Sequence, residues 1–299
     1  MCLLKSMKDI SNLLNFGIIN IDKSAGPTSF SVSEFVKRKL KLKKTSHMGT
    51  LDPKVTGVLP ITLGRACKLA SWIISHDKKY VGILETHKEC DITQLQDIID
   101  KHFVGAIQQT PPHRSAVKRQ SRSRTVYIWK LLEAREDNRS FLFEAMVEGG
   151  TYIRKLCSDL GELIGGGHMG ELRRTGAGIF SEYQETIAAK LVKLDEFEEA
   201  VNEMRDGNED KIREIVIPAE TVIKKILPVV RVDKSALKSL WVGRPLLLSN
   251  VCQNKDFTLK VKKIETGDTF AAFCEDAFVG IYQKSNEESI FARPEFVYN

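Results

Sequence analysis

The chain has 299 residues, of which 42% are hydrophobic and 28% charged, and a formal net charge of +6. This length suits about two domains of ~100–200 residues each, and the composition excludes a disordered, low-complexity or collagen-like chain. The six cysteines form no C-x-x-C pair, which excludes a zinc ribbon and a disulfide framework and favours reduced thiols. No apolar run reaches the ~18 residues of a membrane span, and no signal peptide is predicted at 1–16.

The first two thirds of the chain alternate predicted strands and helices. A strand is predicted at 17–21, followed by a turn and by a helix at 30–42 that Thr28 or Ser29 can cap. Residues 46–57 are rich in Gly, Thr, Asp and Pro, which indicates a loop. Further strands are predicted at 58–63, 80–86, 125–133 and 141–147, and further helices at 66–75 and 151–164.

The pattern changes near residue 195. Residues 195–214 hold nine acidic and three basic side chains, which predicts a solvated pair of helices. Beyond a connector flanked by Pro218 and Pro228, the chain reads as short strands at 229–232, 245–248, 257–264, 269–273 and 278–282. The sequence therefore predicts an α+β domain at 1–220, with a mixed, mainly antiparallel sheet, and a small β-barrel domain at 221–299.

The loop at 46–57 carries the first candidate for chemistry. It is a long polar loop between buried-looking elements, and such loops are often functional. Within it, Asp52 precedes Pro53, which holds the aspartate backbone in extended or turn geometry. An ordinary Asp-Pro turn is the alternative interpretation.

The second candidate follows a predicted strand at Gly149-Gly150. Thr151 is predicted to cap the next helix, which places Arg154 in its first turn. The helix dipole disfavours a cation there, so we expect Arg154 to have an anionic partner. A surface salt bridge is the alternative.

Two basic runs lie in the first domain. Residues 37–44 hold six basic side chains in eight, and no acidic residue falls between Lys101 and Glu133. The second run carries Arg114, Lys118, Arg119, Arg122 and Arg124. A charge run is most often a solvated face, but two runs with the acidic residues segregated elsewhere favour a phosphate backbone as partner.

Other motifs do not support a cofactor or a metal. Residues 165–170 match G-x-G-x-x-G but follow a helix instead of a strand, so the context for a dinucleotide is wrong. No P-loop and no G-x-S-x-G elbow occurs, and the six histidines are scattered without an H-x-x-x-H pair. We therefore expect neither cofactor nor metal.

Three segments resemble motifs of the TruB and dyskerin family of RNA pseudouridine synthases. Residues 23–29, KSAGPTS, resemble K-P-x-G-P-T-S, and residues 47–60 resemble H-x-G-T-L-D-P-x-V-T-G-x-L-P. Residues 150–161, GTYIRKLCSDLG, and 172–175, LRRT, supply the third motif. The likeness covers roughly 17–220 and departs from the pattern at Ser24 and Ser46. More weakly, the tail resembles a PUA domain, a β-barrel that binds RNA, at 243–246.

Within that family, the guide-dependent H/ACA branch fits best. Residues 111–119 run into 122–127 without the insertion typical of bacterial TruB, and 168–172 also look like that branch. The resemblance implies a catalytic subunit that acts with guide RNA on rRNA or tRNA, with small H/ACA accessory proteins and no membrane. It also implies a cytoplasmic place for an archaeal-type enzyme, or a nucleolar one in a eukaryote. A stand-alone tRNA T-loop enzyme and a non-catalytic RNA-binding scaffold remain as alternatives.

The resemblance also implies roles at the site. The reaction breaks the glycosidic bond of a uridine, turns the base and rejoins it through carbon, with no redox partner or energy source. Asp52 is then the nucleophile or base, and Arg154 holds it ionised and oriented. Tyr80 stacks on the target base, with its hydroxyl near the proton that moves.

Substrate-side residues are implied in the same way. Leu172 packs beneath the pocket, and His47 helps to hold the base out of its stack, since a base must be flipped to be reached. Lys23 belongs to this group as a support of the core more than as a chemical participant. The run at 113–124 is expected to grip RNA, and the C-terminal module to bind guide RNA through backbone and shape.

Overall fold

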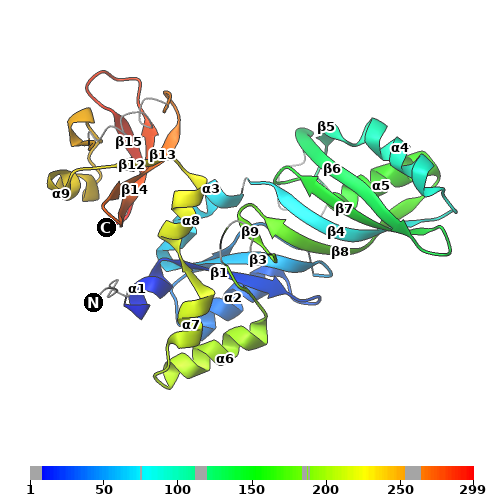
Figure 1. Cartoon of the computed structure of the whole chain (residues 1–299), viewed down its shortest axis with the longest axis horizontal. Coiled ribbons are helices and arrows are strands. Elements are labelled where there is room, and N and C mark those ends of the chain that lie inside the picture. Colours follow the sequence, from blue (N-terminus) through cyan, green and yellow to red (C-terminus); the bar gives the residue numbers. More distant parts are fainter. Residues whose placement is uncertain (1–8, 75, 112–119, 184–186, 188, 253–263) are drawn as a thin grey trace, which may run out of the picture. The chain divides into compact units, whose positions relative to one another are not determined.

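The computed structural model describes residues 9–74, 76–111, 120–183, 187, 189–252 and 264–299. The chain divides into two compact units, Met1–Ile217 and Pro218–Asn299 (Figure 1). No helix within the described ranges is both long enough and apolar enough to cross a membrane.

The first unit is built on an 11-stranded sheet whose main path runs β10-β1-β3-β8-β4-β7-β6-β5. Strand β2 also pairs with β3, β9 with β8, and β11 with β1. The strands are β1 (Gly17–Lys23), β2 (Thr45–His47), β3 (Thr56–Leu63), β4 (Lys78–Thr86), β5 (Gly105–Gln109), β6 (Arg122–Ala134), β7 (Ser140–Val147), β8 (Gly167–Ala177), β9 (Phe180–Ser181), β10 (Leu191–Val192) and β11 (Val216–Pro218). Strands β1 and β10 pair in parallel, as do β3 and β8. The pairs β1–β3, β2–β3, β4–β7, β4–β8, β5–β6, β6–β7 and β8–β9 are antiparallel. The predicted α+β class with a mixed, mainly antiparallel sheet is confirmed for this unit.

Helices cover this sheet at several places. They are α1 (Ile10–Asn15), α2 (Ser29–Lys39), α3 (Ala70–Ile74), α4 (Ile92–His102), α5 (Ile153–Ile164), α6 (Leu194–Arg205) and α7 (Asp210–Ile215). Helix α2 lies against β2 and β3, α4 against β6, α5 against β8 and α6 against β1 (Figure 1). Each amphipathic helix buries its apolar stripe in this way; in α5 the stripe is Ile153, Leu156 and Leu160.

The core of the first unit lies where these helices meet the sheet. Strand β3 is buried at seven of its eight positions, as expected for a central strand covered on both faces. Strand β4 is instead buried at alternate positions. Trp129 packs edge-on against Phe143, with ring centroids 6.1 Å apart, and against Phe103 at 5.5 Å. This packing joins β6 and β7 to the end of α4.

One glycine is required for the sheet to close around the site. Gly57 pairs with Arg174 across the parallel β3–β8 register. Its φ is +101°, and a Cβ there would lie 2.2 Å from the Arg174 carbonyl oxygen. Any other residue at this position would separate the two strands next to the Asp52 loop.

The second unit contains a four-stranded sheet in the order β12-β13-β14-β15. Its elements are α8 (Ala219–Ile226), β12 (Val229–Arg231), α9 (Leu237–Trp241), β13 (Thr269–Cys274), β14 (Ala277–Lys284) and β15 (Ala292–Val297). Phe270 stacks on Tyr282 at 6.1 Å within its core. The predicted strand at 257–264 lies almost wholly outside the described residues, so the closed barrel stays a prediction.

Several element predictions are confirmed and some are wrong. Thr28 caps α2, accepting from the Ser31 backbone at 3.0 Å, and the acidic stretch forms the predicted helical pair. The loop at 46–57 is shorter than predicted, because β2 extends to His47 and β3 begins at Thr56. Thr151 does not cap α5: its buried hydroxyl has no partner among the described residues, and Tyr152 occupies the N-cap position. The predicted strand at 245–248 is reduced to one bridge, between Leu246 and Ala292.

Candidate active site

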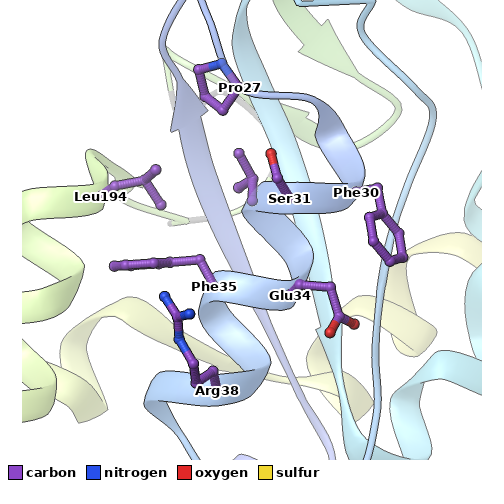
Figure 2. Close-up of a pocket in the computed structure, with 8 residues that line it drawn as sticks. Pro27, Phe30, Ser31, Glu34, Phe35, Arg38 and Leu194 are labelled. Carbon is purple, nitrogen blue, oxygen red and sulfur yellow. The ribbon is translucent and has the colours of Figure 1, made fainter.

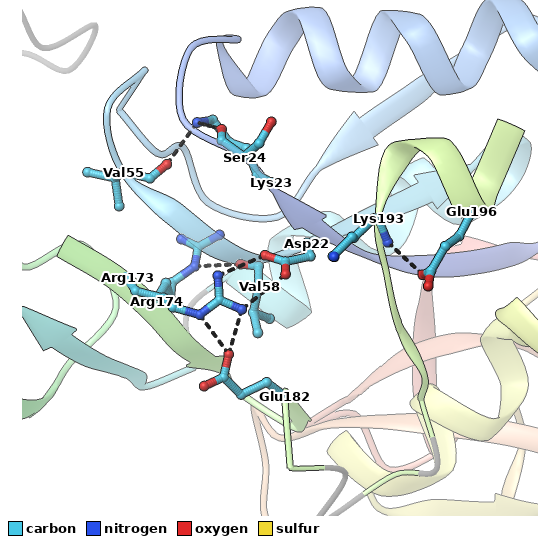
Figure 3. Close-up of polar contacts among 10 residues, drawn as sticks. All are labelled: Asp22, Lys23, Ser24, Val55, Val58, Arg173, Arg174, Glu182, Lys193 and Glu196. Atoms are coloured by element: carbon cyan, nitrogen blue, oxygen red, sulfur yellow. Dashed lines mark hydrogen bonds and ion pairs between the residues drawn. The ribbon is translucent and has the colours of Figure 1, made fainter. Parts of the chain in front are cut away.

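The Asp52 loop, residues 48–55 between β2 and β3, is fixed from beneath by a buried lysine. The Lys23 side chain is completely buried, and its ammonium donates to the carbonyls of Ser24 at 2.9 Å, Pro53 at 3.0 Å and Val55 at 2.8 Å (Figure 3). Burial, and then the charge of Arg174, lowers the pKa of Lys23. All three of its donors are used within the chain, which suits a support of the loop.

The start of α2 holds the same loop from another side. The Leu51 backbone N–H donates to Ser29 Oγ at 2.8 Å, and that hydroxyl lies 3.2 Å from the Leu51 carbonyl. The Gly26 N–H donates to the Pro53 carbonyl at 2.9 Å. Asp52 is therefore flanked on both sides by residues whose backbone is tied down, while its own side chain is 53% exposed. A carboxylate held in this way is preorganised and accessible.

Asp52 is joined to Arg154 by an ion pair across 102 residues of sequence. Arg154 Nη2 donates to Asp52 Oδ2, and the arginine side chain is 49% exposed. The anionic partner expected for an arginine in the first turn of α5 is thus the aspartate of the other motif. Because both groups remain half exposed, a substrate can reach the carboxylate without first breaking a buried ion pair.

Tyr80 lies in β4, buried to 8% exposure, and opposite Arg174 in the β4–β8 register. Arg174 is 1% exposed; its Nε donates to the Val58 carbonyl at 2.8 Å and its Nη2 to the Gly49 carbonyl at 3.0 Å (Figure 3). Burial lowers the pKa of this guanidinium, and a hydrogen bond with the Tyr80 side chain opposes that shift. Arg174 thereby connects Tyr80 to the loop that carries Asp52.

His47 ends β2 at the other end of that loop. Its Nε2 lies 3.1 Å from Thr50 Oγ1. Burial, followed by the charge of Arg174, lowers the pKa of His47 below 6.5. A neutral imidazole keeps both a donor and an acceptor nitrogen at pH 7, which suits a hydrogen-bonding contact more than a charge contact.

Leu172 lies in the apolar core of the first unit. It is 8% exposed and shares a core cluster with Tyr80 and Leu51. It lies two residues before Arg174 in β8, opposite Gly82. A Cβ at Gly82 would come within 2.8 Å of Leu172 Cδ1, so the glycine makes room for this side chain.

A charged clamp holds the adjoining strands in place. Arg173 donates from Nη1 and Nη2 to both carboxylate oxygens of Asp22, at 2.9 and 3.1 Å, and from Nε to Glu182 at 2.9 Å (Figure 3). A two-point guanidinium–carboxylate pair fixes geometry as well as charge. The clamp links β1, β8 and the turn after β9, directly beside Lys23 and Arg174 in sequence.

Of the five predicted RNA-binding residues, the structure describes Arg122 and Arg124; Arg114, Lys118 and Arg119 lie outside the described residues. Both described arginines line a small cavity of about 80 Å³, together with Gln109, Pro111, Gly150 and Tyr152. Arg124 Nη1 also donates to Glu148 Oε1 at 3.0 Å. Two of its lining residues, Gly150 and Tyr152, belong to the turn that leads to Arg154.

Sequence reasoning missed Arg174, Ser29 as a loop support, and Lys78. Lys78 is 5% exposed; its ammonium donates to the carbonyls of Ile74, at 2.9 Å, and His76. Burial first, and then Arg174, lowers the pKa of Lys78 to about 8. A signal for Arg174 was present, since recognising 167–177 as a strand places it on the same face as Leu172.

A second hollow, of about 500 Å³, contains none of the predicted site residues. It is lined by residues of α2 and by Leu194 at the start of α6 (Figure 2). Its members are Pro27, Phe30, Ser31, Val32, Glu34, Phe35, Arg38 and Leu194. Among the residues that the structure describes, no three His, Cys, Asp or Glu side chains converge as metal ligands would.

Comparison with known proteins identifies the family. Residues 37–153 match the N-terminal domain of TruB family pseudouridylate synthases, and residues 154–224 match the tRNA pseudouridylate synthase B C-terminal domain. A probable tRNA pseudouridine synthase B of Korarchaeum cryptofilum is 44% identical over 242 residues, covering 80% of this chain and 71% of that protein. One from Methanothermobacter thermautotrophicus is 38% identical, covering 88% and 77%.

Comparison with solved structures supports the same family. An H/ACA ribonucleoprotein bound to a substrate RNA containing 2′-deoxyuridine includes a chain that superposes with a TM-score of 0.82 and 30% identity, over 98% of this chain and 88% of that one. A Cbf5–Nop10–Gar1 complex includes one with a TM-score of 0.83 and 33% identity, over 97% and 87%. With both motifs meeting at one carboxylate, the chain belongs to the TruB family of RNA pseudouridine synthases and is closely similar in structure to archaeal Cbf5.

Proposed function

We propose that this pseudouridine synthase is the catalytic subunit of an H/ACA-type ribonucleoprotein, directed to its uridine by a guide RNA. The observation that carries the chemistry is the exposed Asp52–Arg154 ion pair on a loop that Lys23 and Ser29 immobilise. The observation that supports the guided role is the likeness of the whole chain to subunits of H/ACA assemblies.

In this proposal Asp52 is the nucleophile or base. It acts while the N1–C1′ bond of uridine breaks and the C5–C1′ bond forms; the proton on C5 is finally lost to solvent, and N1 takes up a proton. Arg154 keeps the carboxylate ionised and aimed through a charge-assisted pair. Tyr80 supports the target base, with Arg174 holding its hydroxyl in place. None of these steps changes the oxidation state of the substrate, so the protein side chains suffice for it.

The other residues hold the base and the backbone. His47, neutral and bonded to Thr50, contacts the base or ribose after the uridine has left its stack. Leu172 supports the target base from the apolar core beneath the pocket. Lys23 acts indirectly, by holding the carbonyls of Pro53 and Val55, which follow Asp52 in the loop.

For the RNA backbone, we assign the phosphate contacts to the basic run. Arg122 and Arg124 line a cavity that opens beside Gly150, and a Cβ at Gly150 would lie 3.1 Å from Arg124 Nη2. A bare glycine there lets a phosphate approach the guanidinium closely. Arg114, Lys118 and Arg119 extend the same run, and the C-terminal unit, as a PUA-like module, binds guide RNA through its backbone.

A second candidate function is stand-alone modification of tRNA. It is favoured by the names of the relatives at 44% and 38% identity, which are probable tRNA pseudouridine synthases B. The two functions share the site and differ in what delivers the uridine.

Tritium release from RNA labelled at carbon 5 of uridine separates them. The full chain is assayed on a tRNA transcript alone, and on a target RNA with guide RNA and small accessory proteins. The guided proposal predicts release from the target only when guide and accessory proteins are present. Release from tRNA alone, with none from the guided target, would overturn it in favour of the second function.

A further inference from the structure

A buried glutamine joins the end of β5 to the start of α5. Gln109 is 3% exposed. Its Nε2 donates to the Tyr152 carbonyl at 3.1 Å, and its Oε1 accepts from the Tyr152 N–H at 2.9 Å. The side-chain amide therefore pairs with both backbone groups of one residue that lies 43 positions away in sequence.

Tyr152 is the residue on which the orientation of α5 depends. It occupies the N-cap position of α5 and makes no side-chain cap. The preceding turn contains Gly150 at φ +92°. Glycine has little backbone preference, so this residue does not fix the direction in which the chain enters α5. Arg154 follows two residues later, in the first helical turn. A small rotation at Tyr152 would therefore displace the guanidinium from Asp52.

The turn is tied down a second time by Glu148. Its carboxylate accepts from Arg124 Nη1 at 3.0 Å and from the Thr125 N–H at 2.9 Å. Both ties run to the β5–β6 hairpin, and the one from Gln109 is made to the residue at the N-cap of the helix. The contact between Gln109 and Tyr152 is also neutral and buried, so salt does not weaken it.

We propose that Gln109 is a positioning residue for the reaction: by holding both backbone groups of Tyr152, it aims Arg154 at Asp52. The inference rests on the proposed role of Arg154. It assigns to Gln109 no contact with substrate and no proton transfer.

The test compares Gln109→Met with the matched control Gln108→Met. Methionine keeps the length and volume of the side chain but removes both hydrogen bonds. Gln108 is the neighbouring residue on β5, is exposed, and meets Ser121 at 3.2 Å instead of α5. Tritium release is measured under single-turnover conditions on whichever RNA the unchanged protein converts, with RNA affinity and melting temperature measured alongside.

The expected result is a fall in rate of about 10- to 100-fold for Gln109→Met, since a misplacement of ~1 Å costs up to ~10²-fold. RNA affinity should stay within about 2-fold, and Gln108→Met should match the unchanged protein. Gln109→Asn, which keeps an amide one methylene too short, should also be slow. If Gln109→Met and Gln109→Asn both fold and keep the full rate, the proposal is wrong.

A double-mutant cycle with Arg154→Lys separates positioning from general stability. If Gln109 acts through Arg154, the effect of Gln109→Met shrinks to within about 2-fold when Arg154→Lys is already present. An equal loss in both backgrounds would show a merely structural role and overturn the proposal. Full activity of Arg154→Lys and of Arg154→Ala would instead contradict the proposed role of Arg154, which is a distinct outcome.

Discussion

Two buried cations stand behind the Asp52 loop, and both bind its backbone. Lys23 is fully buried and Arg174 is 1% exposed; between them they donate to the carbonyls of Gly49, Pro53 and Val55. These hydrogen bonds offset part of the cost of burying each cation, because buried charges without partners are strongly destabilising. Asp52 is thus presented on a rigid loop with positive potential beneath it, and Arg154 reaches the carboxylate from the other motif.

Replacing Arg154 tests whether that pair serves the reaction. We expect Arg154→Ala to lower the single-turnover rate by about 10²–10³-fold, because removal of one preorganised charged partner costs this much in comparable sites. RNA affinity should change little, since the side chain faces Asp52. Tritium release and filter binding measure the two quantities. Weaker binding with an unchanged rate at saturation would show that Arg154 holds RNA instead.

Lys78 predicts a pH dependence of stability. Burial lowers its pKa from 10.5 to about 8 in the folded protein. The folded state therefore loses this proton before the unfolded state does, and the stability of the protein rises with pH between 8 and 10.5 on account of this group. Below pH 8 the charged form carries the full cost of its burial, although Asp77 opposes part of the shift.

The comparison of the unchanged protein with Lys78→Met isolates this effect. Between pH 7 and pH 10, the free energy of unfolding of the unchanged protein should rise relative to Lys78→Met by about 2 kcal/mol. Urea unfolding at several pH values measures it. A difference between the two proteins that stays constant with pH would show that Lys78 keeps an ordinary pKa.

At the scale of elements, the site depends on contacts between segments that are distant in sequence. The Asp52 loop is held by β1 and α2, and Arg154 by the turn before α5. Strands β3 and β8, which pair in parallel, can approach this closely at position 57 because the residue there is glycine. Arg173 then clamps β8 to β1 through Asp22. The shape of the site therefore depends jointly on β1, α2, β3, β8 and the turn before α5.

Lys23→Met tests the support of the loop. The variant removes the Lys23 donor from the Ser24 and Val55 carbonyls and leaves the Pro53 carbonyl with the Gly26 N–H alone, which should destabilise the protein by about 1–3 kcal/mol. The rate of tritium release should fall as well, because Asp52 lies directly before Pro53. Lys54→Met is the matched control, since Lys54 is an exposed lysine in the same loop. Equal rates for the two variants would show that Lys23 does not position Asp52.

The comparison with the sequence is clearest at this scale. Local patterns predicted β1, α2, β3, β6, β7 and the helical pair, because each carries its own capping or apolar period. Strand β8 was not predicted because its glycines and charges hide the alternation. Thr151 does not cap α5, because Tyr152, which Gln109 binds, takes the N-cap position instead. Arg154 and Asp52 were predicted as a pair only through the resemblance. No local rule reports that Lys23 reaches Pro53 or that Arg174 reaches Gly49.

At the scale of the whole molecule, the formal net charge of +6 favours a polyanion as partner. Within the first unit, the charges are segregated. The acidic residues gather in α6 and α7, whereas Arg122 and Arg124 open into the cavity beside the turn before α5. Binding of RNA should consequently weaken with salt in proportion to the phosphates that are contacted.

Arg122→Gln tests the phosphate assignment. Loss of one phosphate contact should reduce the slope of log affinity against log salt concentration by about 1. Arg139→Gln is the control, because Arg139 follows the opposite end of β6 and pairs with Glu89 at 3.4 Å. The slope is measured by titration of RNA at several salt concentrations. An unchanged slope for Arg122→Gln would remove this residue from the RNA surface.

The central claim is that Asp52 carries the reaction, and one measurement tests it most directly. Asp52→Asn keeps the size of the side chain and its place on the loop but removes the charge and the nucleophile. Tritium release from uridine labelled at carbon 5 should fall by more than about 10³-fold, with RNA affinity and melting temperature close to those of the unchanged protein. An Asp52→Asn protein that releases tritium at the full rate would contradict the account.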